Sequence, residues 1–191
     1  ANMLAFNQAV AQRSSLDPFL DRDYLARYIA VDRVLMNDDG LFHFYCNVNM
    51  QRSWNHNYYW YETETAPHFW PIPWDLDLSF EGTPWVALAR PWSESAPCTC
   101  AQHDVYEFQT PSACDPLVQG FIRESAAVES AIDVFLAGPF ARDRVQAKLD
   151  SWSTQIRPFV VEAAGVLEAP SEADWAQAVM ELGAIADSLR Q

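Results

Sequence analysis

The aromatic-rich stretch of residues 56–80 constrains the fold more than any other part of the chain. Aromatic residues favour pleated, half-buried strands, so residues 57–61 and 68–78 are predicted to form a β-hairpin closed by a polar loop. Pro71 and Pro73 have no backbone N–H to donate to a neighbouring strand. Part of the second strand is therefore expected to remain unpaired on at least one side.

Two carboxylates, Asp75 and Asp77, lie near the end of the second predicted strand. Because they are two positions apart, they would leave the same face of an extended strand, while Trp74, Leu76 and Leu78 take the other face. Carboxylates among large apolar residues are costly unless a cation or hydrogen-bond donors compensate them. The pattern favours a divalent metal site, with solvated edge residues as the alternative.

A core helix is predicted over residues 17–37, where apolar and aromatic residues recur with helical spacing. Asp17 is the expected N-cap and Pro18 occupies the first turn. The pattern ends in an Asx- and glycine-containing turn that holds Asp38 and Asp39. Acidic groups are thus placed where a helix gives way to a loop.

Asp38 and Asp39 could converge with Asn57, at the start of the hairpin, and with the two carboxylates at its far end. Mg²⁺ typically takes one or two carboxylates, with waters and substrate phosphates completing its shell, and this set has the right chemistry. The alternative is that Asp38 and Asp39 only cap a turn.

The rest of the chain is predicted to be irregular and then helical. Residues 81–116 hold turn formers without sustained periodicity and are expected to form an irregular, cysteine-containing insertion. Helical apolar spacing follows near residues 117–137, 140–164 and 171–190, which predicts a helical bundle. Ser171 is the expected cap of the last helix.

The four cysteines are Cys46, Cys98, Cys100 and Cys114. Three of them lie in a loop-like stretch, which an exported protein often staples with a disulfide, so we expect a bridge from Cys98 or Cys100 to Cys114. A zinc site that also uses His103 is less favoured because the usual Cys-x-x-Cys spacing is absent. Free thiols are the third possibility.

Composition excludes several classes of function. The 191 residues are half hydrophobic, enough for one globular domain, and the formal charge of −14 would repel nucleic-acid phosphates and anionic membranes. No apolar run is long enough to span a membrane, and any export signal is expected to lie outside this sequence, which begins with alanine.

Three motifs together resemble the CotH spore-coat kinases, an atypical family with a protein-kinase-like fold. They are LARYIAVDRVLMNDDG, NHNYYWYE and IPWDLDLSF, in the order that the family has them. The resemblance covers residues 17–80 well and the helical remainder loosely. It implies an α+β fold: a mainly helical kinase-like C-terminal lobe, with a short β-hairpin that carries the metal-site aspartates. One domain portion over residues 1–191 would then comprise catalytic motifs (1–80), an insertion (81–116) and helices (117–191).

The resemblance also implies an activity and residue roles. The activity is transfer of phosphate from ATP, with Mg²⁺ or Mn²⁺, to Ser or Thr of secreted, cell-surface or spore-coat proteins. Asp39 matches the catalytic aspartate that orients or deprotonates the acceptor hydroxyl, with Asp38 as its rival. Asn57 matches the amide that helps to hold metal and phosphates, Asp75 the metal-binding aspartate, and Asp77 a second ligand or support.

Two departures from a kinase stand out. The 17 residues from 40 to 56 separate Asp39 from Asn57, so residues 41–55, predicted as a short strand and a loop, must fold out as an insertion. Kinases also grip the phosphates with a Gly-rich loop and a lysine. Here the only lysine is Lys148 and no two glycines fall close together, so the N-terminal nucleotide lobe is expected to be missing from this sequence. Replacement of the lysine by an arginine is less favoured.

Other readings remain. The second hypothesis is a non-catalytic surface or coat module that keeps the fold and binds cations or a partner through its acidic face. A metal-dependent hydrolase is the third. His56, beside Asn57, could be a catalytic base, but a histidine in such a turn more often fixes the loop by hydrogen bonding.

Overall fold

The computed structural model describes residues 2–37, 39–49, 52–80, 98–102, 108–121, 125–164, 166 and 169–188. By their internal contacts the residues form two compact units, Ala1–Ile132 and Asp133–Gln191. The sequence-predicted metal ligands and catalytic residues all belong to the first unit. Each unit is described separately below.

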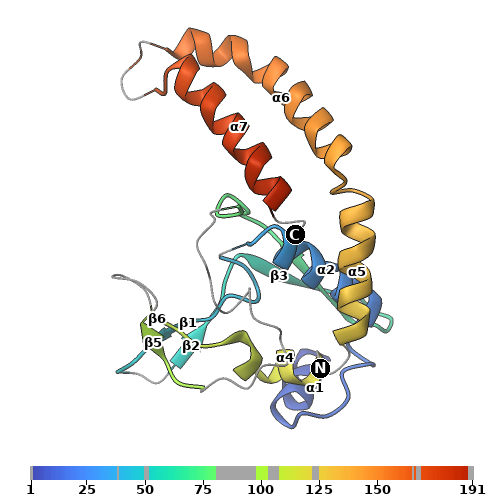
Figure 1. The fold of residues 1–191 in the computed structure, drawn as a ribbon. Helices are drawn as coiled ribbons and strands as arrows, with labels where there is room; N and C mark the ends of the chain where they lie inside the picture. The colour runs from blue at the N-terminus through green and yellow to red at the C-terminus, as the bar shows by residue number, and fades with distance from the viewer. Residues whose placement is uncertain are drawn as a thin grey trace. The chain divides into compact units, whose positions relative to one another are not determined.

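The helix α2 spans Arg22–Val34 (Figure 1) and begins five residues later than the sequence predicts. Asp21, not Asp17, is the N-cap, and its side chain accepts a hydrogen bond from the backbone N of Tyr24 at 2.7 Å. Asp17 instead binds the side chains of Ser15 and Arg22. Both aspartates can cap a helix, but Phe19 and Leu20 between them are tied to the hairpin: Phe69 N donates to the Phe19 carbonyl, and Leu20 forms a bridge with Phe69, so the helix begins only after them.

The predicted hairpin is confirmed, with β3 at Tyr58–Glu62 and β4 at Phe69–Pro73. The strands pair antiparallel from Tyr58 opposite Pro73 to Glu62 opposite Phe69. In the described residues β4 has no other strand partner, apart from an isolated bridge between Leu20 and Phe69, as its prolines require. The second strand is shorter than predicted because it ends at Pro73.

One face of this hairpin builds the core of the first unit. The ring of Phe6, on α1 (Asn2–Ala11), stacks on Phe69 at a centroid distance of 5.0 Å and meets Trp60 edge-on at 5.2 Å. The opposite face leaves Tyr59 and Tyr61 exposed. Alternation along the strand therefore fixes which aromatic rings are buried.

Residues 41–55 contain two strands where the sequence predicts one. They are β1 (Tyr45–Asn47) and β2 (Arg52–Trp54), which pair antiparallel. The sheet order is β2-β1-β6-β5, completed by β5 (Ala101–Gln102) and β6 (Phe108–Gln109). Asn55 Nδ2 donates a hydrogen bond to the Leu41 carbonyl, which brings the two ends of this stretch together. Residues 41–55 therefore form an insertion that begins and ends at the same place.

Both disulfides of the structure hold this region. Cys98 is bonded to Cys114, which confirms one of the two predicted pairings, and Cys46 is bonded to Cys100, which the sequence did not predict. The 3₁₀ turn η1 (Ser112–Cys114) and the helix α4 (Pro116–Phe121) follow, and α4 lies beside α1 (Figure 1). No cysteine is left free for a zinc site.

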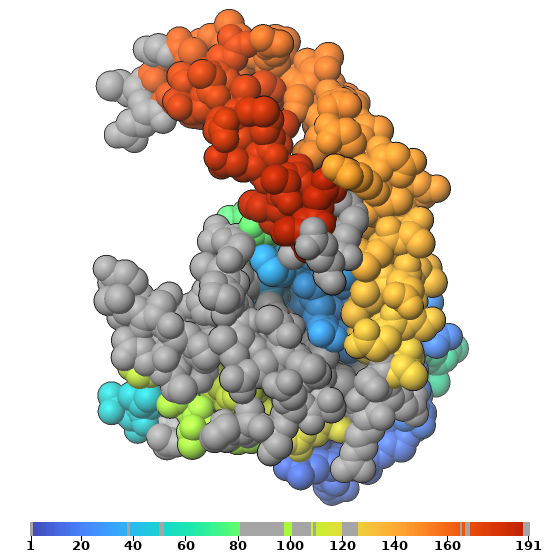
Figure 2. All heavy atoms as spheres, in the orientation of Figure 1, coloured from blue at the N-terminus to red at the C-terminus, as the bar shows by residue number. Residues whose placement is uncertain are grey.

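The predicted helices of the C-terminal part are also present. They are α5 (Ser125–Ala137), α6 (Arg142–Ala163) and α7 (Glu172–Ser188). In the second unit α6 and α7 pack side by side (Figure 2), and ion pairs Arg142–Asp187 and Arg157–Glu172 show that they run antiparallel.

Ser171 caps α7 as predicted. Its Oγ accepts a hydrogen bond from Asp174 N at 3.1 Å, and its own backbone N donates to Asp174 Oδ2 at 3.3 Å, which is a capping box. Across the described helices, none combines the length and apolarity that a membrane span needs.

Candidate active site

Asp39 lies in the connection between α2 and β1, and three side chains hold its carboxylate. Tyr45 donates its hydroxyl to Oδ1 at 2.6 Å, Asn57 donates Nδ2 to Oδ2 at 2.6 Å, and His56 Nε2 lies 2.5 Å from Oδ1. The Asp39 side chain is only 13% exposed. Its orientation is therefore fixed by partners from two separate parts of the chain.

Asn57 is the residue that connects this carboxylate to the hairpin. It is 6% exposed and has φ = 58°, a left-handed conformation that asparagine tolerates better than most residues. Its backbone oxygen accepts a hydrogen bond from Trp74 N at 3.1 Å, one step beyond the last pair of the β3–β4 ladder. Asp75 follows directly, so the backbone that carries it is tied to Asn57.

Asp75 and Asp77 do not lie on a strand, so the expectation of one shared strand face is wrong. The strand ends at Pro73, Asp75 has φ = 55°, and Asp77 begins a turn. Both side chains are exposed. Within the described ranges, no three histidine, cysteine, aspartate or glutamate side chains are grouped as a ready metal site. Asp38 lies outside the described residues.

A buried polar cluster fixes the loop that carries Asp39. Asn37 Nδ2 donates to Asp32 Oδ1 at 2.9 Å, and both residues are buried. A Cβ on Gly40 would lie 2.3 Å from Asn37 Nδ2, so a larger residue there would have to displace the Asn37 side chain. Burial raises the pKa of Asp32 to about 7, with the Asn37 hydrogen bond and nearby His43 acting in the opposite direction.

A cavity of about 240 Å³ lies between α2 and residues 73–79. Tyr28, Asp32, Asn37 and Ser79 are among its lining residues, and each has a buried oxygen without a hydrogen-bond partner in the described structure. Buried polar atoms of this kind are usually satisfied by ordered water.

The model of the CotH kinase protein family matches residues 2–188. The chain belongs to the CotH kinase family. Comparison with curated proteins and with solved structures gives no match.

For a CotH kinase family member, the contact between Asp39 and Asn57 is the central geometric result. Sequence reasoning proposed that the two residues meet if the intervening stretch folds out as an insertion, and they do meet. Asp75 is joined to them through the backbone of Trp74, whereas none of the described hydrogen bonds or ion pairs links Asp77 to either residue. The contact of His56 with Asp39 agrees with a role in fixing the loop.

Sequence reasoning missed Tyr45 and Asp32. Tyr45 belongs to the inserted strand, and no spacing in the sequence indicates that its hydroxyl reaches back six positions to Asp39. Asp32 occupies a helix position between apolar residues, and an acidic residue on an otherwise buried helix face is the signal that could have singled it out.

Proposed function

We propose that this member of the CotH kinase family is a metal-dependent protein kinase that transfers the γ-phosphate of ATP to Ser or Thr of surface or coat proteins. The observation that carries the proposal is the hydrogen bond between Asp39 and Asn57. It joins the residue that matches the family's catalytic aspartate to the one that matches its phosphate- and metal-binding amide.

The oxygen groups present fit a hard divalent cation such as Mg²⁺ or Mn²⁺. Asn57 uses Nδ2 for its bond to Asp39, and no described hydrogen bond uses its Oδ1. Asp75 and Asp77 have exposed carboxylates. Asn57 and Asp75 would hold the metal, with Asp77 as second ligand or support, and the metal would neutralise the charge of the nucleotide phosphates.

Asp39 would act on the acceptor hydroxyl, with Asp38 as the rival for that role. Because Tyr45, His56 and Asn57 fix the Asp39 carboxylate, it is preorganised, and positioning accounts for most of the catalysis of phosphoryl transfer. The two disulfides agree with an extracellular, cell-surface or spore-coat location. That residues 1–191 form one portion of a kinase-like domain, without the nucleotide lobe, stays a prediction.

A specific observation favours the alternative of a non-catalytic binding module. Both oxygens of Asp39 already accept hydrogen bonds from neighbouring side chains, an arrangement that also suits a purely structural carboxylate. In that case the acidic face would bind cations or a partner without phosphate transfer.

The test measures ATP binding and phosphate transfer in the presence of Mg²⁺ or Mn²⁺. Both are measured for the naturally expressed protein and for its Asp75→Ala variant. Loss of both signals in the variant is expected for the kinase. The matched control is Asp150→Ala, which removes an exposed carboxylate of α6 and should change neither signal. Metal binding without transfer by the unaltered protein would instead establish the binding module.

A further inference from the structure

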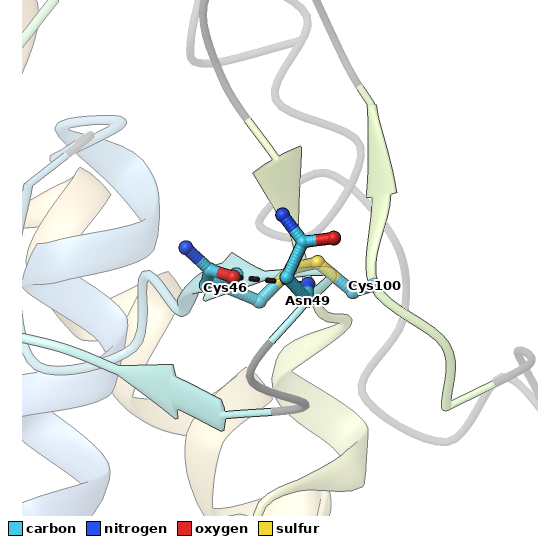
Figure 3. Close-up of a disulfide and its surroundings, with 4 residues drawn as sticks. Cys46, Asn49 and Cys100 are labelled. Carbon is cyan, nitrogen blue, oxygen red and sulfur yellow. Dashed lines mark hydrogen bonds between the residues drawn. A yellow bond between two sulfur atoms is a disulfide. The ribbon is translucent and has the colours of Figure 1, made fainter.

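The strand β1 contains two adjacent residues, one of which contacts Asp39 while the other forms a disulfide. Tyr45 donates its hydroxyl to Asp39 Oδ1 at 2.6 Å, and the next residue, Cys46, is bonded to Cys100. Figure 3 shows the sulfur bridge that joins Cys46 to Cys100. A covalent link to a segment 54 residues away is therefore one peptide bond from a residue that holds Asp39.

Within the inserted hairpin, Tyr45 pairs with Trp54 of β2, and their rings stack at a centroid distance of 6.4 Å. The strand β1 has three residues, and every residue of its partner β2 is exposed, so the hairpin buries little apolar surface of its own. Isolated two-stranded hairpins are marginally stable, and pairing with more strands or packing is needed to fix them. On its other side, within the described residues, β1 pairs with β6 through Tyr45 and Gln109, and Thr110 N donates to the Phe44 carbonyl beside this pair.

The Tyr45 ring also contacts two histidine rings. It lies 4.3 Å from the His43 ring and meets the His56 ring edge-on at 5.0 Å, measured between centroids. His56 in turn contacts Asp39. A shift of β1 would therefore displace two of the three partners of the carboxylate together.

We propose that Tyr45 is a positioning residue for Asp39 and that the Cys46–Cys100 disulfide holds it in place, so that the site works fully only in the oxidised protein. This inference rests on the proposed kinase function. A dithiol reductant would cleave the S–S bond by a two-electron transfer, leaving thiols on Cys46 and Cys100 and converting the reductant to its own disulfide.

The chain offers a matched control in its second disulfide. Cys98–Cys114 begins two residues from Cys100 and staples the same region, but neither of its cysteines adjoins any of the described partners of Asp39, which are Tyr45, His56 and Asn57. The comparison is therefore between the double variants Cys46→Ser/Cys100→Ser and Cys98→Ser/Cys114→Ser, each made in the naturally expressed protein. Tyr45→Phe removes the hydroxyl alone.

Two measurements separate positioning from folding. In steady-state kinetics, Cys46→Ser/Cys100→Ser and Tyr45→Phe are each expected to lower kcat about tenfold with little change in KM for ATP, since a hydrogen bond to a charged group is lost. Combining them should add little further loss, because both act through the same contact. The side-chain amide resonances of Asn57, which donates to the same carboxylate, should shift alike in both variants.

The control double variant should keep kcat and the Asn57 resonances. The inference is overturned if Cys46→Ser/Cys100→Ser keeps the unaltered rate and spectrum, or if both disulfides prove equivalent. If the unaltered protein transfers no phosphate, the kinase proposal fails, and unshifted Asn57 resonances in Tyr45→Phe would separately show that Tyr45 does not position Asp39.

Discussion

Asn57 Nδ2 lies 2.6 Å from Asp39 Oδ2, although the two residues are 18 positions apart. The contact exists because the intervening residues leave the site as a β-hairpin and return to it, with Asn55 bonded to the Leu41 carbonyl at the base. A kinase-type pairing of carboxylate and amide is thus compatible with a long insertion between them.

Asn57→Asp is expected to lower phosphate transfer by about tenfold or more, because it replaces a hydrogen-bond donor to Asp39 with a second negative charge. Aspartate tolerates the left-handed backbone at this position, which separates the electrostatic effect from backbone strain. The measurement is kcat/KM together with the melting temperature. Asn49→Asp, on an exposed residue of the inserted hairpin, is the control and should leave kcat/KM unchanged. An equal loss in both variants would count against a specific role for Asn57.

Gly40→Ala is expected to destabilise the protein by about 1–3 kcal/mol, because the added methyl group collides with a buried side chain. Its Cβ would lie 2.3 Å from Asn37 Nδ2 and 3.0 Å from Asp32 Oδ1. The matched change is Gly183→Ala in α7, where the nearest atom is Leu149 Cδ1 at an ordinary 3.6 Å. That variant should be neutral or stabilise by about 0.5–1 kcal/mol, since alanine favours helix. Denaturant unfolding measures both, and similar values would show that the loop around Asp32 can relax.

The stability of the protein should fall as pH rises from about 4 to about 7 through the contribution of Asp32. Burial raises the pKa of this carboxyl from 3.8 to about 7, so in this window the folded chain keeps a proton that the unfolded chain releases. Stability from the protonated form is complete below the unfolded pKa and is lost as pH passes the folded one.

The measurement is the free energy of unfolding at pH 5 and pH 8 for the unaltered protein and for Asp32→Asn, which cannot ionise. The variant should gain relative stability at pH 8 compared with pH 5. Asp133→Asn, which alters a more exposed aspartate of α5, is the control for changes in net charge. A difference between the unaltered protein and Asp32→Asn that is independent of pH would contradict the raised pKa.

Several elements could be predicted because their signals are local. The hairpin β3–β4 is indicated by two short aromatic-rich runs separated by a polar loop. The cap of α7 is indicated by Ser171, which bonds to a residue only three positions away. The start of α2 was predicted wrongly because Asp17 and Asp21 carry the same capping signal, and tertiary contacts of the residues between them decide where the helix begins. The end of β4 was missed because alternation continues in the sequence beyond Pro73, whereas the pairing does not.

The residues of the candidate site also fall into those that the sequence predicted and those that it did not. Family resemblance on short motifs supplied Asp39, Asn57 and Asp75, but neither motif nor spacing could supply Tyr45 or the Cys46–Cys100 bond. Both of these depend on where a short inserted strand settles against segments distant in sequence.

By itself the sequence determined what is periodic or local: the amphipathic helices, the aromatic hairpin, the helix cap and the motifs of the CotH kinase family. Only the tertiary structure decided which side chains meet Asp39, which cysteines pair and which aspartate is buried with a raised pKa. The physical reason is the distance along the sequence over which each effect acts, since helix and strand propensities and helix caps depend on a few neighbouring residues. Hydrogen bonds, disulfides and desolvation instead depend on distances that the folded chain alone sets.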